Sequence, residues 1–75
     1  MFVDNYSYID LCEKLIGKTV SFKSDCEFFP NFHIVGVVIS IKIANNNEFI
    51  ITIIHNGKQY DIGSRMKNLT FEIMS

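Results

Sequence analysis

Hydrophobic and polar residues alternate most regularly between positions 49 and 62. Apolar side chains there occupy every second position on both sides of Asn56-Gly57: Phe49, Ile51, Ile53, Tyr60 and Ile62. Asn-Gly between two such runs is typical of a two-residue hairpin turn, whose central residues take positive φ. The turn places His55 opposite Lys58 and so fixes the register of both strands. We therefore expect a β-hairpin with the five apolar residues on one face.

A different spacing, of three and four residues, precedes the first strand and predicts a helix from about Ser7 to Ile16. Its apolar stripe consists of Tyr8, Ile9, Leu11, Cys12, Leu15 and Ile16. Ser7, with Asp10 three residues later, resembles a capping box, and Gly17 supplies a stop signal at the other end. Asp4, Asp10 and Glu13 then belong to the start and the solvated face of this helix.

Three further segments alternate as strands do: 18–23, 32–43 and 69–73. In the long middle segment we expect one apolar face, formed by Val35, Val37, Ile39, Ile41 and Ile43. Gly36 lacks a Cβ atom and is expected to mark a bend in this strand. Residues 24–31 are polar and are interrupted by Pro30, which predicts a loop.

The whole chain is expected to form one domain, residues 1–75, of the all-β class with one N-terminal helix at about residues 7–16. Short strands that follow one another directly, in a chain with 48% hydrophobic residues, favour a small five-stranded barrel. Closure into a barrel would remove the exposed edges of an open sheet. The helix would cover one open end of this barrel.

Two stretches carry a resemblance to known proteins: Leu15-Ile16-Gly17-Lys18-Thr19-Val20 and Ile34-Val35-Gly36-Val37-Val38. In this order they resemble the helix, first strand and second strand of the Sm-like and Src-homology-3-like small barrels. The resemblance implies the fold and a habit of forming rings through strand edges. The Sm-like RNA-binding motifs are not reproduced at 41–44 or 63–65, so uridine binding is assigned to no residue. The short Ile- and Asn-rich chain also resembles accessory proteins of phages and mobile elements, including anti-defence inhibitors.

Composition and charge narrow the classes of partner. A domain of 75 residues lacks the interior to hide 48% hydrophobic residues, so part of the apolar surface is expected to meet a protein partner. A net charge of −1 argues against binding that depends on neutralising phosphates. If nucleic acid is nevertheless bound, the candidate contacts are basic residues that would have to converge in space: Lys23, Lys58, Arg65 and Lys67. No apolar stretch is long enough to span a membrane and no signal-peptide pattern is present, so we expect no membrane partner and a cytoplasmic location.

Catalytic and metal-binding patterns are not found. Cys12 and Cys26 are expected to be reduced thiols, and together with His33 and His55 they lack the paired spacing of a zinc site. Neither histidine has a nucleophile or an acidic partner that spacing can identify, and His55 is expected to be a solvent-facing turn residue. We therefore expect no enzyme, no metal and no cofactor.

Two groups of residues are candidates for partner contact. Phe28, Phe29 and Phe32 surround Pro30, and either protrude into a partner or close the end of the barrel. Ile50 and Ile54 should point outward from the hairpin, where they would form either an interface with a partner or a second copy, or a surface covered by the helix.

Taken together, these patterns favour a non-enzymatic interaction protein. The specific hypothesis is an inhibitor or adaptor, encoded by a phage or mobile element and of the anti-defence type, that occludes a macromolecular partner. One alternative is an Sm-like module that binds nucleic acid or a nucleotide. A second alternative is a small structural subunit of a larger assembly, and a homo-oligomer is compatible with all three.

Overall fold

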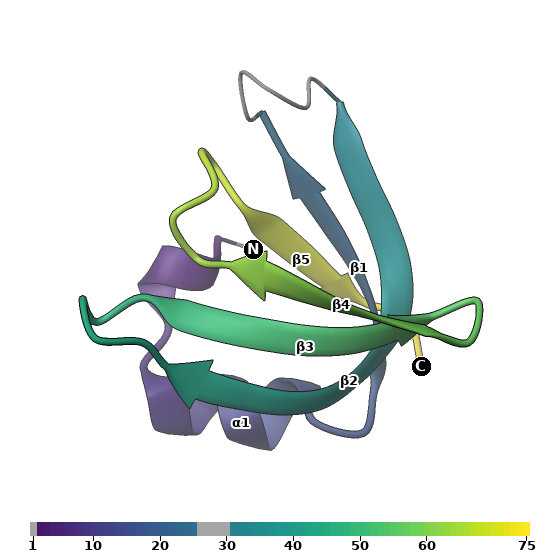
Figure 1. The fold of residues 1–75 in the computed structure, drawn as a ribbon, viewed down its shortest axis with the longest axis horizontal. Coiled ribbons are helices and arrows are strands. Elements are labelled where there is room, and N and C mark those ends of the chain that lie inside the picture. The colour runs from purple at the N-terminus through teal and green to yellow at the C-terminus, as the bar shows by residue number, and fades with distance from the viewer. Residues whose placement is uncertain (1, 26–30) are drawn as a thin grey trace.

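A computed structural model describes residues 2–25 and 31–75 of the chain (Figure 1). A short 3-10 helix, η1 (Val3–Asn5), and the helix α1 (Tyr8–Leu15) precede the strands. The strands are β1 (Thr19–Ser24), β2 (Phe32–Ile43), β3 (Phe49–His55), β4 (Lys58–Gly63) and β5 (Thr70–Ile73). All pairings are antiparallel, in the order β4-β3-β2-β1-β5. The predicted β-rich class with one N-terminal helix is confirmed, whereas the sheet is not closed into a barrel.

The helix α1 begins and ends close to the residues that the sequence indicates. The Ser7 side chain accepts a hydrogen bond from the Asp10 backbone N–H at 3.2 Å, as expected of a helix cap. Gly17 takes a φ of +85° directly after the helix, a conformation that glycine adopts without strain. Leu11 and Leu15 are buried, and Tyr8 and Cys12 pack against the core, so this part of the predicted apolar stripe faces the sheet. Ile9 and Ile16 were expected in the same stripe, but they are 66% and 43% exposed.

The β3–β4 hairpin has the predicted register, with His55 opposite Lys58, and its turn residues Asn56 and Gly57 take φ values of 51° and 76°. Three of the five residues on the expected face are fully or almost fully buried: Ile51, Ile53 and Ile62. Tyr60 shares this face but remains 41% exposed. Tyr60 was expected to point inward with them, but it lies nearer the hairpin turn on the last strand of the sheet and is less covered than Ile62 of the same strand.

The long strand β2 does not keep a single apolar face from Val35 to Ile43. Its register against β3 shifts between Val38 and Ser40, which is a β-bulge. The extra residue reverses the alternation, so Val38 is buried before the bulge and Ile41 after it. Val37 and Ile39, both expected inside, are 40% and 45% exposed.

Gly36 allows β2 and β3 to approach each other closely. A Cβ atom at this position would lie 2.5 Å from the backbone oxygen of Ile54. Only glycine fits there without moving one of the strands. The close contact is a reason for glycine at this position that the sequence alone did not indicate, and a bend at Gly36 stays a prediction.

The core lies between the inner face of the curved sheet and α1. Its buried residues are Val3, Leu11, Leu15, Val20, Phe22, Val38, Ile41, Ile51, Ile53, Ile62, Leu69 and Phe71.

The Tyr8 hydroxyl donates a hydrogen bond to the Ile41 carbonyl at 2.9 Å and ties the helix to β2. A hydrogen bond with the Cys12 side chain, the negative charge of its thiolate form and burial raise the pKa of Tyr8 above its ordinary value. In residues 2–25 and 31–75, no helix has the length and hydrophobicity needed to cross a membrane.

Candidate binding groove on the outer face of β1 and β5

Polar side chains collect on the outer face of the sheet around β1. Val20 and Phe22 of β1 are buried in the core, so the alternate residues Ser21 and Lys23 point to the opposite face. Strand β5 places Glu72 beside Ser21 and Thr70 beside Lys23. The neighbouring strands thus bring together hydroxyls, an ammonium group and a carboxylate that are far apart in the sequence.

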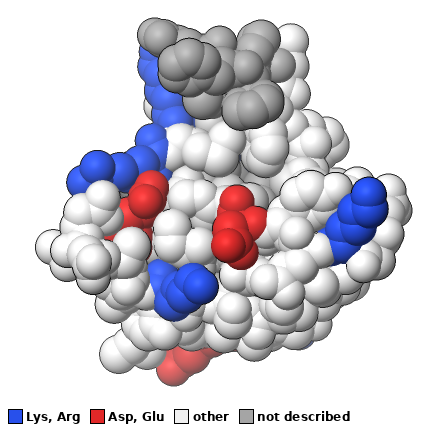
Figure 2. All heavy atoms as spheres, viewed as in Figure 1, with Lys and Arg blue, Asp and Glu red and all other residues white. Residues whose placement is uncertain are grey.

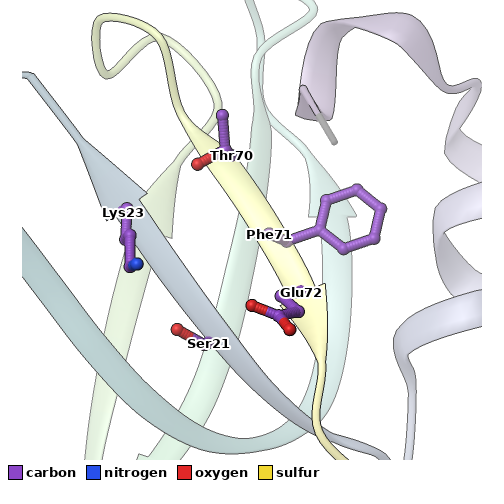
Figure 3. A pocket seen from close by; sticks show the side chains of 5 residues that line it. All are labelled: Ser21, Lys23, Thr70, Phe71 and Glu72. Atoms are coloured by element: carbon purple, nitrogen blue, oxygen red, sulfur yellow. The ribbon is translucent and has the colours of Figure 1, made fainter.

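These side chains line a shallow depression of about 290 Å³. Figure 3 shows Ser21 and Lys23 on β1 and Thr70 and Glu72 on β5 around the same space, with Phe71 turned to the other side of β5. A second hollow of about 330 Å³ shares Lys23 and Thr70 with the first. Its other lining residues are Phe2, Ser24, Asp25 and Asn68. We call the two hollows together the β1–β5 groove.

The far end of the groove is built by the turn that precedes β5. The Ser24 hydroxyl and the Asp25 backbone N–H both donate hydrogen bonds to the Lys67 carbonyl, at 2.8 and 3.0 Å. The Asn68 side-chain amide donates a weaker bond to the Asp25 carboxylate at 3.4 Å. These bonds hold the turn against the end of β1 and position Asp25 and Asn68 beside Lys23.

A serine and a histidine meet on the same face of the sheet. A hydrogen bond of 2.8 Å joins the Ser21 Oγ and the His33 Nε2, where β2 runs beside β1. Such a contact is also found between a nucleophile and its general base. However, Ser21 is only 5% exposed, and its strand is paired on both sides, so the adjacent backbone N–H groups are engaged in the sheet. The arrangement can donate and accept hydrogen bonds, but it offers no free backbone donors for an oxyanion.

The basic residues expected for nucleic acid do not form one surface. Lys67 lies near the end of β1 that also carries Lys23, because its carbonyl bonds to Ser24 and Asp25. Lys58 begins β4 at the opposite edge of the sheet. The Arg65 backbone N–H donates to the Glu48 carboxylate at 3.3 Å, which places Arg65 beside an acidic residue. Figure 2 shows charges of both signs interspersed on the viewed face rather than one basic area.

The residues expected to contact a partner have different positions. Phe28 and Phe29 lie outside the described residues. Phe32 is partly buried and packs against the core. Ile50 and Ile54 alternate with buried residues of β3 and so lie on the outer face, but each is only partly exposed. The helix packs on the inner face and does not cover them.

Sequence reasoning missed three of the polar contacts around β1 and β3. Alternation in 18–23 places Ser21 and Lys23 on one face, but it does not say that β5 adds Glu72 or that β2 adds His33. His55 was expected to face solvent, yet its Nδ1–H donates to the Val35 carbonyl at 2.7 Å. No cluster of three or more potential metal ligands occurs within the described part of the chain.

No protein-family model matches this chain, and comparisons with curated proteins and with solved structures also find no match. Its function is therefore inferred from the geometry of the groove.

Proposed function

We propose that this chain is a non-enzymatic interaction protein that binds a protein partner along the β1–β5 groove and thereby occludes part of the partner's surface. The observation that carries the proposal is the presence of opposite charges in one open depression. Lys23 and Glu72 both line it, together with the hydroxyls of Ser21 and Thr70. This mixture of donors and acceptors suits a polypeptide, which carries both kinds of group along its backbone and side chains.

The charges of the groove favour a protein over a nucleic acid. A phosphate backbone would gain from Lys23 but would be repelled by Glu72 and Asp25, which line the same two hollows. The acidic net charge of −1 acts in the same direction.

An apolar contact is available at the end of the groove. Phe2 lines the second hollow and is 49% exposed. Aromatic side chains beside polar groups are common anchors of protein interfaces. Phe2 would thus supply hydrophobic contact area, while Lys23 and Glu72 would set the orientation of the partner.

The type of fold and the biological role of the chain also belong to what we propose. A fold related to the small barrels of the Sm-like or Src-homology-3-like kind, but with an open sheet, is supported by the antiparallel strand order and the strong curvature of β2. An inhibitor or adaptor encoded by a phage or mobile element is a role that needs only a binding surface, and a binding surface is what the groove offers.

The test is affinity capture from extracts of the cells that produce the protein, with charge reversals in the bait. Lys23→Glu and Glu72→Lys alter the groove, and Lys42→Glu and Glu13→Lys make the same changes at exposed positions on β2 and α1. We expect a captured protein to lose affinity about tenfold or more with each groove variant and to keep it with both controls.

Three results would overturn the proposal. One is capture that responds equally to groove and control variants, and another is no specific capture at all. The third is capture that nuclease treatment abolishes and that weakens steeply with salt, which would favour the nucleic-acid alternative.

A further inference from the structure

Strand β4 has an open edge with a defined set of unpaired backbone groups. In the described part of the chain it pairs only with β3. The Ser64 N–H donates to the Phe49 carbonyl at 2.9 Å, which shows that every second residue back from Ser64 points its backbone groups toward β3. Gln59 and Asp61 therefore direct their N–H and C=O groups away from the sheet. Within residues 2–25 and 31–75, no backbone hydrogen bond reaches these groups.

We propose that a second copy of this chain pairs with this edge, with β4 antiparallel to β4 about a two-fold axis at Tyr60. In this register Gln59 of each copy lies opposite Asp61 of the other, and the two residues exchange both backbone hydrogen bonds. The two sheets would become one continuous sheet across the axis. Because the same strand is used on both sides, the assembly closes as a dimer.

The side chains of Gln59 and Asp61 select this register. Both lie on the outer face of β4, so the Gln59 amide of one copy can donate to the Asp61 carboxylate of the other. One oxygen of that carboxylate already accepts a bond from the Thr52 hydroxyl at 2.8 Å, and the second oxygen has no such bond in the described structure. A shift of one copy that centres the axis on Asp61 would place the two Asp61 carboxylates opposite each other, and like charges in that position destabilise a strand pair.

Tyr60 supports the same arrangement from the inner face. It is 41% exposed, although Ile53 opposite it on β3 and Ile62 two residues further along β4 are buried. On the two-fold axis, Tyr60 would face Tyr60 of the second copy in the closely spaced, non-hydrogen-bonded type of pair. Aromatic pairs at such positions stabilise antiparallel strands. The exposed ring would then gain the cover that this chain alone does not provide.

The other edge of the sheet is less available, which favours a two-fold dimer over a head-to-tail ring. Phe2 forms a β-bridge with Thr70, and the Val3 N–H donates to the Leu69 carbonyl at 3.0 Å. A second copy adding its β4 to β5 would have to displace these contacts. In the described part of the chain, the β4 edge has no comparable bridge.

Sedimentation velocity of the purified chain over a wide range of concentration tests the dimer and its register. We expect a monomer–dimer equilibrium that Gln59→Lys tightens and Gln59→Glu weakens, because each change acts opposite Asp61 twice per dimer. Each should change the dissociation constant by about 2- to 30-fold, and added salt should reduce both effects. Asn45→Lys and Asn45→Glu make the same charge changes at an exposed turn position and should leave the equilibrium unaltered.

Three results would overturn the proposal. The first is a wild-type chain and a Gln59→Lys variant that both stay monomeric at the highest concentration. The second is an equilibrium that responds alike to changes at Gln59 and at Asn45, which would place the interface elsewhere. The third is a trimer or larger ring, which would indicate head-to-tail pairing. The measurement uses the chain alone, so it does not depend on the partner proposed for the β1–β5 groove.

Discussion

The two edge strands of the sheet, β5 and β4, differ in how far their inner faces are buried. Phe71 on the inner face of β5 is 2% exposed, whereas Tyr60 on the inner face of β4 is 41% exposed. The N-terminal segment makes the difference: Phe2 bridges to Thr70, and the Tyr6 ring packs edge-on against Phe71 with ring centres 5.4 Å apart. Within residues 2–25 and 31–75, no segment packs on Tyr60 of β4 in the same way. One edge is therefore part of the core and of the groove, and the other keeps its capacity to pair.

The largest loss of stability is expected from a substitution in the covered edge strand, β5. Phe71→Ala should lower the free energy of unfolding by about 3–5 kcal/mol, because it empties a site enclosed by the core and by Tyr6. Urea unfolding of dilute protein measures this change. Tyr60→Ala is the matched control and should cost clearly less, since much of that ring is already in water. Equal losses at both positions would show that the two edges do not differ in cover.

The next largest loss of stability is expected where β2 and β3 approach each other at Gly36. Gly36→Ala should destabilise the fold by about 1–3 kcal/mol, because the new Cβ would lie 2.5 Å from the backbone oxygen of Ile54, which the sheet holds in place. Gly63→Ala is the control in β4. There the new Cβ would meet the flexible end of Glu48 at 2.7 Å, which can move. Thermal or urea unfolding that ranks the two variants in the reverse order would contradict the close approach at Gly36.

A smaller effect is expected where the helix is tied to the sheet. Tyr8→Phe removes the hydrogen bond to the Ile41 carbonyl and should cost about 0.5–1.5 kcal/mol. The control is Tyr60→Phe in the edge strand β4, which should change the free energy of unfolding by less than about 0.5 kcal/mol.

The stability difference between the wild type and Tyr8→Phe should depend on pH in a direction that the pKa of Tyr8 predicts. The pKa of Tyr8 is raised in the folded chain, first by its hydrogen bond with Cys12. A raised pKa favours the folded state below the ordinary tyrosine value and loses that contribution as the pH rises through the folded pKa. The stability gap between the wild type and Tyr8→Phe should therefore narrow above about pH 10. A gap that widens there would contradict the direction of the shift.

Local features of the fold could be predicted from the sequence, because neighbouring residues decide them. Asn56-Gly57 determines the turn and with it the register of β3 and β4, and Ser7 with Asp10 determines where the helix begins. The bulge near Ile39 could not be predicted, since either face of β2 offers apolar residues and only pairing with β3 selects between them.

The candidate site was harder to predict for a related reason. Ser21 and His33 meet because β1 lies next to β2, and Glu72 joins them because β5 lies on the other side of β1. No spacing along the chain encodes these neighbours. Alternation shows only that Ser21 and Lys23 share a face, and the strand order supplies the rest.

The smallest expected effect tests the open edge directly. Gln59→Pro removes a backbone N–H that points away from the sheet and so should cost about 1 kcal/mol or less in dilute protein. Tyr60→Pro removes an N–H that points toward β3 and introduces the same ring one residue later, so it should be far more destabilising. Urea unfolding of the two variants compares the inward and outward positions of β4 within one strand. If Gln59→Pro proves as harmful as Tyr60→Pro, the Gln59 N–H is engaged within the monomer, and the edge is not free to pair with a second copy.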